Sequence, residues 1–570
     1  MMCLLTLCGC VNTTPSNDGN DDIDEFPDFN QNQGENNNQN NNQNDNENQE
    51  EVVDPNADYL VSRIVELSQN KTYIEVDGKP YAIRGGQVRL DGLTNDYLDE
   101  PDRPAPLTDS EIELYFKTAK EIGLNTVEIP IEWRRVEPAK DQYDFSLVDK
   151  VLTMANNYDL KMELLWFSVN MCGDSFANQV PTYIFEDTYT YSRFTCDKHI
   201  VSRMYGEATW LIANDPDLME RETKALTNLM QHVHEWNLAN GRKNPLIGVQ
   251  VHNEADGMLR WRLPQRNLKY NGSPADPTFV WNAILGGLDN AGKAIKASKY
   301  KVYTRVNMTV TLGTGMFPEY PNHNFSARDV IALEGIDIVG DDAYNEEPTN
   351  INKDMKQYSI NGNYPHIAEN MGDYASSPSL FLTTYQAGGS YMFYDMATPE
   401  FFVYLNGNSD YHMNQGLLKP DLTYKDHTAE TLRIVAGIKK MDSIIPLVYS
   451  TDFAAFNVKT KTPNVSHTQT ICTSNIEVTY KTNNGGIAFA IEHDGYLYIY
   501  STKDCMFSIN NATYYLGAQI GYYNGEEFVV DQLQYLPYMG NEFNVTAEKL
   551  YRFKITEIVR EVKSTTNENV

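Results

Sequence analysis

Residues 246–254 read Leu-Ile-Gly-Val-Gln-Val-His-Asn-Glu, a short run of mostly apolar residues that ends in three polar ones. A run of this length is typical of a strand that is buried on both faces, as in a parallel sheet. Seven similar runs lie elsewhere in the chain, and helical or long crossover segments separate them. We predict eight strands, which begin near residue 83 and lie at 125–130, 161–167, 246–251, 301–306, 335–339, 364–368 and 390–394.

The segments between these strands carry helix signals. Thr108-Asp109-Ser110-Glu111 is a capping box, and apolar residues follow it at helical spacing as far as Gly123. Further helices are predicted at 147–158, 218–236 and 279–296. Alternating strands and helices imply a parallel sheet with right-handed crossovers, and eight such units suit a closed (β/α)₈ TIM barrel. An open doubly wound sheet is the competing α/β fold, but no Gly-x-Gly-x-x-Gly follows a strand.

The pattern changes after about residue 441. Short alternating strands follow, separated by turn dipeptides such as Asp494-Gly495 and Asn524-Gly525. We therefore predict a barrel over 59–440 and an all-β sandwich over 441–570. The tyrosines of the sandwich either line a glycan groove or fill the sandwich core. We favour the core, because aromatic residues in a small sandwich mostly pack there and across strands.

Composition narrows the class of partner. The 570 residues carry 46 Lys and Arg against 78 Asp and Glu, a formal net charge of −32. Such a chain repels phosphate, and no basic patch interrupts it, so we expect no nucleic-acid partner. No apolar run has the length of a bilayer span. No Cys-x-x-Cys or His cluster has metal-ligand spacing, so neither a metal nor another cofactor is expected.

The first ten residues, MMCLLTLCGC, resemble a bacterial lipoprotein signal in which the last cysteine, Cys10, is acylated. A plain secretory signal or a misassigned start codon is the alternative. Residues 11–58 are rich in Asn, Gln, Asp and Glu and too poor in apolar residues to order, so we predict a solvated tether. We expect a secreted protein that touches a bacterial outer membrane or cell surface only through this lipid anchor.

Four further cysteines lie in the body of the chain. Cys172 and Cys196 form one pair along the sequence, and Cys472 and Cys505 form the other. Each pair either forms a bridge in an oxidising compartment or stays as buried thiols.

Two of the predicted strands end on a carboxylate. Asn253-Glu254 follows the fourth strand, and Glu369 follows the seventh. Because the carboxyl ends of barrel strands meet at one rim, the two glutamates are expected to face each other across its mouth. Hydrolysis of a glycosidic bond needs such a pair: an acid that protonates the leaving oxygen, and a carboxylate opposite it that meets the positively charged sugar carbon. The sequence therefore predicts a glycosidase.

At these residues the chain resembles the clan of retaining (β/α)₈ glycoside hydrolases that carry Asn-Glu on strand four and Glu on strand seven. Within that clan it is most similar to the family 35 and family 42 β-galactosidases and their Bacteroides-type relatives. The segments 76–87, 129–145, 164–167 and 180–181 carry the resemblance, which spans about residues 72–396. The resemblance implies that Glu254 is the acid/base and Glu369 the nucleophile.

Further site residues follow from the same resemblance. It implies that Asn253 hydrogen-bonds the sugar 2-hydroxyl and that the Tyr344 hydroxyl, after strand six, supports the nucleophile. Arg84 is a second group expected to keep Glu369 ionised.

Aromatic side chains supply the remaining candidates. Trp166 ends strand three and either stacks on a sugar face or caps the barrel core, and Trp133 is a sugar-stacking candidate on the same grounds. Glu132 and Asp342 are expected to be ion-paired rather than catalytic. The long insertion at 168–212, rich in Tyr, Phe and Asp, is expected to shape the leaving-group side.

The sequence thus predicts a retaining, β-galactosidase-like glycoside hydrolase that cleaves a terminal or internal sugar of a larger glycan, with an oligo- or polysaccharide as its partner. Two alternatives stay open. One is a non-catalytic, glycan-binding surface lipoprotein on the same barrel, and the other is a β-mannan or β-glucan hydrolase.

Overall fold

The structure is a computed structural model of the chain. It describes residues 58–68, 71–88, 107–169, 179–196, 210–263, 268–309, 317, 320–343, 347–370, 372, 375–397, 416–458, 465–514, 517–535 and 542–558. The predicted signal with Cys10, most of the predicted tether, Cys172 and Tyr344 lie outside the described residues. Within the described part, no helix has both the length and the hydropathy needed to cross a membrane.

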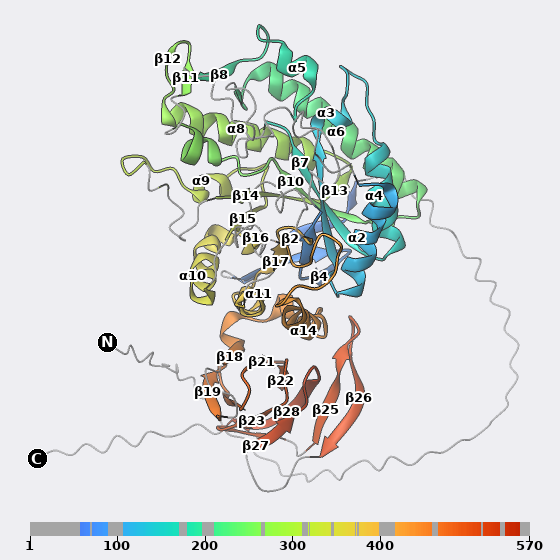
Figure 1. Cartoon of the computed structure of the whole chain (residues 1–570), viewed down its shortest axis with the longest axis vertical. Coiled ribbons are helices and arrows are strands. Elements are labelled where there is room, and N and C mark those ends of the chain that lie inside the picture. Colours follow the sequence, from blue (N-terminus) through green and yellow to red (C-terminus); the bar gives the residue numbers. More distant parts are fainter. Residues whose placement is uncertain are drawn as a thin grey trace, which may run out of the picture. The chain divides into compact units, whose positions relative to one another are not determined.

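Eight parallel strands close into a barrel in the order β10-β14-β15-β16-β17-β5-β6-β7. Their bounds are β5 (Arg84–Gln87), β6 (Thr126–Glu132), β7 (Lys161–Phe167), β10 (Leu246–Val251), β14 (Tyr303–Met308), β15 (Ile338–Asp342), β16 (His366–Asn370) and β17 (Ser390–Phe393). Figure 1 shows these strands at the centre of the upper part of the molecule, among the helices. The predicted fold class is confirmed, and the fifth, sixth and seventh strands begin and end two to three residues later than predicted.

The crossover helices cover the outside of the barrel. They include α2 (Asp109–Glu121), α4 (Ser146–Asn157), α6 (Pro216–Ala239), α8 (Pro277–Lys296), α10 (Pro348–Tyr358), α11 (Ser377–Gln386) and α14 (Thr428–Lys439). The capping box of α2 is formed as predicted, because Glu111 N donates to Thr108 Oγ1 at 3.3 Å and Thr108 N donates to Glu111 Oε2 at 2.7 Å. Asp215 and Asp276 cap α6 and α8, whose first residue is a proline in each case.

The amino-terminal strands form a small antiparallel sheet, β2 (Ser62–Ser68), β3 (Lys71–Val76) and β4 (Lys79–Tyr81). Asp77 and Gly78 connect β3 to β4 with φ angles of 50° and 74°. Two successive positive φ angles are the mark of a type I′ turn, which the Asp-Gly pair predicts. Ser62 Oγ accepts a hydrogen bond from Tyr303 N at 3.0 Å, so this sheet is joined to the amino-terminal end of barrel strand β14.

Two segments that leave the carboxyl ends of β7 and β10 pair with each other. They form a four-stranded sheet in the order β12-β11-β8-β9, with β8 (Arg193–Cys196), β9 (Trp210–Leu211), β11 (Leu268–Tyr270) and β12 (Ser273–Pro274). Lys269 lies opposite Thr195 in the antiparallel register. The short helix α5 (Thr182–Glu186) lies within the segment 179–196 and precedes β8. This sheet therefore stands on the carboxyl-terminal rim, where barrel enzymes carry their sites.

The C-terminal part consists of two antiparallel sheets, as predicted for a sandwich. One has the order β18-β21-β22-β28-β25-β26, and β24 pairs with β28. The other has the order β19-β20-β23-β27. Their bounds are β18 (Phe453–Val458), β19 (His467–Cys472), β20 (Glu477–Thr482), β21 (Gly486–His493), β22 (Tyr496–Ser501), β23 (Cys505–Ile509), β24 (Ala512–Tyr514), β25 (Gly517–Tyr523), β26 (Phe528–Tyr535), β27 (Glu542–Val545) and β28 (Leu550–Ile558).

Burial settles two questions that the sequence left open in this region. Tyr480 is buried in the sandwich core, whereas Tyr498 and Tyr500 are buried in the larger apolar cluster that includes the barrel residues. These tyrosines therefore do not line a groove. Cys505 is a buried free thiol, so it does not form a bridge with Cys472. Burial also raises the pKa of the Cys505 thiol, to about 12, as expected for an inert structural cysteine.

Candidate active site

The interior of the barrel carries a charged layer. Arg305 of β14 donates from Nε to Glu163 Oε2 of β7 at 3.0 Å, and its other nitrogens reach Glu128 of β6 and Gln250 of β10. Gln87 of β5 donates to the second oxygen of Glu128 at 2.8 Å. Burial opposes the charge on Arg305, but the two carboxylates raise the pKa of its guanidinium above the ordinary value. Five strands are thus tied together from inside the barrel.

Because side chains alternate along a strand, this layer fixes which residues point toward the barrel axis. Arg305 points inward, so Asn307, two residues further along β14, lies on the same face. Asn307 is 1% exposed and stands at the carboxyl end of the strand. It lies one layer closer to the mouth of the barrel than the charged layer.

Asn307 holds the turn that follows strand four. Its Nδ2 donates to Asn253 Oδ1 at 3.0 Å and to Asp342 Oδ2 at 2.9 Å. Its Oδ1 accepts a hydrogen bond from Glu254 N at 2.8 Å. One buried amide therefore joins the carboxyl ends of β10, β14 and β15 and fixes the backbone of Glu254.

The turn itself has an uncommon backbone. His252 has a φ of 58° and Glu254 a φ of 44°, so both lie in the left-handed region, which residues other than glycine seldom adopt. Each costs of order 1–3 kcal/mol and persists only where the surroundings determine it, most often at functional sites. Glu254 is partly exposed, whereas His252 is buried.

His252 is anchored on the outside of the barrel. Its Nε2 lies 2.8 Å from Glu222 Oε1 on α6, and the same oxygen accepts a hydrogen bond from Trp166 Nε1 at 3.0 Å. Burial alone would raise the pKa of Glu222, but the charge and hydrogen bond of His252, together with the bond from Trp166, lower it below the ordinary value. A buried ionised carboxylate thus holds the base of the turn.

Glu369 lies in strand β16, and its side chain lies outside the described part of the structure. Along the backbone, Asp341 pairs with Ile367 whereas Asp342 pairs with residue 369, so β16 contains an irregularity at this point. Residues paired across parallel strands share a face, and Asp342 reaches the inward-facing Asn307. The register therefore aligns the backbone of position 369 with that of Asp342, near the carboxyl end of β15. The predicted pairing of the Glu254 and Glu369 side chains stays a prediction.

Arg84 does not belong to this site, and its predicted role is wrong. It is the first residue of β5, so it lies at the amino-terminal end of the barrel. Gln87 points inward to Glu128, so alternation directs Arg84 outward, and its Nε donates to Gly123 O at 3.1 Å. Its guanidinium also forms an ion pair with Asp442, just beyond α14. Arg84 therefore joins the barrel wall to the surrounding segments and cannot support Glu369.

The two tryptophans are also not sugar platforms. Trp166 and Trp133 are fully buried, and their ring centroids lie 6.2 Å apart. Trp166 donates to Glu222, and Trp133 Nε1 donates to Glu137 Oε2 at 3.0 Å. A ring without an exposed face cannot stack on a sugar, so both act as packing and positioning groups. Of the two alternatives for Trp166, the structure supports the structural one.

The remaining acidic candidate of the second strand is ion-paired as predicted. Glu132, the last residue of β6, binds Arg134 and Arg135 at 3.0 Å each. Asp342 accepts a hydrogen bond from Asn307 Nδ2 at 2.9 Å, and its predicted ion pair stays a prediction. Tyr344, the predicted support of the nucleophile, lies outside the described residues, and its role stays a prediction.

A second acidic group lies next to the turn of strand four. Asp256 is buried and accepts hydrogen bonds from Thr309 N at 3.1 Å and Thr309 Oγ1 at 2.8 Å. Burial raises its pKa to about 6, although Thr309 and Arg260 act in the opposite direction. Burial and the nearby Asp354 also raise the pKa of Asp341 well above the ordinary value. Within the described residues, no group of His, Cys, Asp and Glu side chains has the arrangement of a metal site.

Five residues of this arrangement were missed from the sequence. Asn307 follows the predicted end of the fifth strand directly, and an amide at a strand's carboxyl end is a signal that could have identified it. Arg305, Glu128 and Glu163 interrupt apolar strand runs, which indicates an interior ion network. No local signal marks Glu222, because it lies on a helix with many other charged residues.

Residues 103–166, which contain α2, β6, α4 and most of β7, match a family model described as β-galactosidase. The chain resembles the β-galactosidase-type barrel hydrolases. This similarity supports a glycosidase in general. A second match covers residues 283–463 and is to a domain of unknown function, DUF4978. Among curated proteins, no sequence matches this chain.

Solved structures with a similar fold include several glycoside hydrolases. An exo-β-1,4-mannosidase from Opitutaceae bacterium strain TAV5 is 13% identical with a TM-score of 0.44, over 66% of this chain and 63% of that one. Endo-glycoceramidase II from Rhodococcus sp. is 13% identical with a TM-score of 0.41, over 85% of this chain and 99% of that one. A β-galactosidase from Marinomonas ef1 is 13% identical with a TM-score of 0.42, over 63% and 59%. This chain thus spans less than two thirds of the mannosidase and of the galactosidase.

Proposed function

We propose that this protein is a retaining β-glycoside hydrolase that acts on a β-galactoside within a larger glycan. The observation that carries the proposal is the turn after strand four, where Asn307 holds the backbone of Glu254 at 2.8 Å on the carboxyl-terminal rim of the barrel. A carboxyl-bearing residue in a left-handed conformation, fixed from a neighbouring strand, is typical of a preorganised site. Position 369 on β16 supplies the second carboxylate of the pair.

The proposed reaction has two steps. In the first, the Glu254 carboxyl group gives its proton to the glycosidic oxygen while the Glu369 carboxylate attacks the anomeric carbon, so the leaving alcohol departs and a glycosyl ester forms. In the second, the Glu254 carboxylate takes a proton from water, whose oxygen attacks the same carbon and releases Glu369. Two inversions give net retention, which requires the carboxyl groups to lie about 5–5.5 Å apart.

Asn253 has a separate part in this proposal. Its Oδ1 accepts hydrogen bonds from Asn307 Nδ2 at 3.0 Å and from Gln250 Nε2 at 3.3 Å, so the orientation of the amide is fixed. Its Nδ2–H group is then the one offered to the sugar 2-hydroxyl, a contact that strengthens as charge develops at the anomeric carbon.

The test compares the wild type with Glu254→Gln and Glu369→Gln on a panel of aryl β-glycosides. We expect each substitution to lower kcat by about a thousandfold, because general acid–base and nucleophilic groups contribute on this scale. On a dinitrophenyl glycoside, whose leaving group needs no proton, Glu254→Gln should lower kcat less. Glu220→Gln, an exposed glutamate of α6, is the matched control. Hydrolysis that survives in both variants within tenfold of the wild type would remove the proposal.

We also propose that the barrel is held at a bacterial outer membrane or cell surface through acylated Cys10, as its first residues suggest. Metabolic labelling with an alkyne fatty acid tests this. The label should be present on the wild type and absent from Cys10→Ser, and labelling that is equal in both would contradict the anchor.

A further inference from the structure

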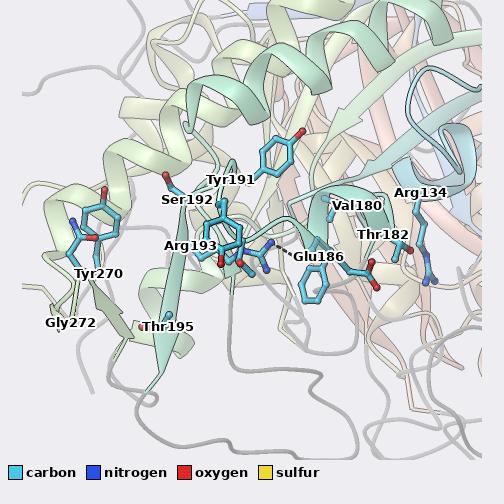
Figure 2. A pocket seen from close by; sticks show the side chains of 14 residues that line it. Arg134, Val180, Thr182, Glu186, Tyr191, Ser192, Arg193, Thr195, Tyr270 and Gly272 are labelled. Atoms are coloured by element: carbon cyan, nitrogen blue, oxygen red, sulfur yellow. Dashed lines mark hydrogen bonds between the residues drawn. The ribbon is translucent and has the colours of Figure 1, made fainter.

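A large cavity opens on the carboxyl-terminal rim, away from the charged layer of the barrel. Its volume is about 970 Å³, and among the described residues its lining comes from α5, β8, the hairpin of β11 and β12, and Arg134 of the short helix α3 (Trp133–Val136). Figure 2 shows the lining side chains, from Tyr270 and Gly272 of the hairpin at one end to Thr182 and Arg134 at the other. Nothing in the catalytic proposal uses this cavity.

The cavity reaches the barrel through Arg134. Arg134 Nη2 is ion-paired at 3.0 Å with Glu132, the last residue of barrel strand β6. Its backbone N donates to Gln179 O at 2.9 Å, which ties it to the segment that follows strand β7. The opposite wall is the hairpin of β11 and β12, which comes after β10 in the chain, and β10 is the strand that precedes Glu254. The cavity therefore lies between loops of strands two, three and four, on the face where a barrel binds its substrate.

Aromatic rings are presented to this cavity on rigid supports. Tyr189 is fully exposed, and the turn that carries it is held by Asp187 Oδ1, which accepts hydrogen bonds from Tyr189 N at 3.1 Å and Thr190 N at 3.0 Å. Tyr270 packs on Phe279 with ring centroids 4.9 Å apart. The two-residue Asn271-Gly272 turn, with φ angles of 49° and 78°, fixes the hairpin beside Tyr270. The Tyr270 ring, held in this way, binds a ligand at a low cost in conformational entropy, and the fixed backbone at Tyr189 keeps the origin of its exposed ring in place.

The polar part of the lining selects a neutral ligand. Arg134 is ion-paired with Glu132, and Arg193 donates to the carbonyl oxygens of Ile184, at 3.1 Å, and Phe185. Glu186 adds a negative charge to the lining. Hydroxyl groups of Thr182, Thr188, Ser192 and Thr195 complete the lining. A phosphorylated or acidic polymer would need a surplus of free cations, which this lining and the net charge of −32 do not offer. Exposed rings among hydroxyl and amide groups match the apolar faces and hydroxyls of sugars.

We propose that this cavity binds a neutral oligosaccharide, namely the part of the glycan chain that lies beyond the scissile bond. The proposal rests on the proposed function and adds to it that the substrate is a chain of several sugars. The volume lies at the upper end of the range of small-molecule sites, which fits more than one sugar ring. Tyr189 and Tyr270 are the stacking residues of this subsite.

The test compares the wild type with Tyr189→Ala, Tyr189→Phe and Tyr270→Ala. For each protein, kcat/KM is measured on aryl β-glycosides and on the hexasaccharides galactohexaose, mannohexaose and cellohexaose. The ratio of hexasaccharide to aryl glycoside should fall about tenfold in Tyr189→Ala and in Tyr270→Ala, because a lost stacking contact changes affinity on this scale. Tyr189→Phe keeps the ring and should restore the ratio to within about twofold of the wild type. Tyr535→Ala, an 85% exposed tyrosine of the sandwich, is the matched control and should leave the ratio unchanged.

Calorimetry separates this proposal from the catalytic one. The same hexasaccharides are titrated into Glu254→Gln and into Glu254→Gln with Tyr189→Ala. Tighter binding to the first protein supports the cavity even if no substrate is hydrolysed, in which case the proposed function alone fails. The subsite proposal is overturned if the hexasaccharides bind equally to both proteins or to neither. It is also overturned if the ratio of kcat/KM on hexasaccharide to kcat/KM on aryl glycoside is the same in all variants.

Discussion

Asn307→Ala is the substitution that tests the architecture of the turn most sharply. Asn307 makes three hydrogen bonds, to Asn253 Oδ1 at 3.0 Å, to Asp342 Oδ2 at 2.9 Å and from Glu254 N at 2.8 Å. Two are between neutral groups, worth about 1 kcal/mol each, and the one to a carboxylate is worth about 1.5–3 kcal/mol. Since these bonds share one residue they are not additive, and we expect a total of about 3 kcal/mol.

This loss should be seen mainly in catalysis. Without Asn307 the strained backbone at Glu254 loses this hydrogen bond, so we expect the acid to leave its working position. A change of about 3 kcal/mol corresponds to a fall of roughly a hundredfold in kcat, with a smaller change in KM. The assay is steady-state hydrolysis of an aryl β-glycoside, with thermal unfolding in parallel. Asn228→Ala on the exposed face of α6, where Nδ2 donates to Lys224 O at 2.8 Å, is the matched control.

One result would contradict this role of Asn307. If Asn307→Ala folds and keeps kcat within threefold of the wild type, the turn does not depend on this amide, and Glu254 is positioned by other groups or does not act as the acid.

Three further predictions concern stability. Burial holds the pKa of Asp256 at about 6 in the fold, above its ordinary value of 3.8, so the native state binds the extra proton. The free energy of unfolding should therefore fall by about 3 kcal/mol in total as pH rises from about 3 to about 7, and then level off. In urea unfolding, Asp256→Asn should lack this fall. Arg305→Met leaves two buried carboxylates without their cation and should lower the free energy of unfolding by about 3–5 kcal/mol, and a smaller loss in urea titrations would argue against an ionised network. Glu222→Gln weakens the anchor of His252 and should cost about 2 kcal/mol by thermal unfolding, whereas Glu220→Gln on the same helix should cost none.

The order of strands and helices could be predicted because it depends on local patterns. Each barrel strand is an apolar run, and the helix at 109–121 begins at a capping box that the structure contains. The turn at Asp77-Gly78 follows from the same kind of local chemistry. Such features need only neighbouring residues, so the sequence specifies them directly.

The site could be predicted only in part, because the direction of a side chain depends on whether its position in the strand faces the barrel axis or the surrounding helices. A strand that is apolar on both faces does not reveal which residues point inward, so Trp166 was predicted to lie at the mouth although it faces α6 and Glu222. Arg84 was placed at the wrong end of its strand for a related reason, since an apolar run does not show where the barrel rim begins. Glu254 and Asn253 follow their strand, so they could be placed at the rim without knowing which strand positions point inward.

The central claim is that Glu369 becomes covalently attached to the sugar while Glu254 acts as acid and base. The most direct measurement treats the protein with a 2,4-dinitrophenyl 2-deoxy-2-fluoro-β-galactoside, whose fluorine slows the second step, and locates the added sugar by peptide mass spectrometry. We predict one fluorosugar per chain, attached to the peptide that contains Glu369. A label on any other residue, or turnover of β-galactosides with inverted configuration and no label, would contradict it.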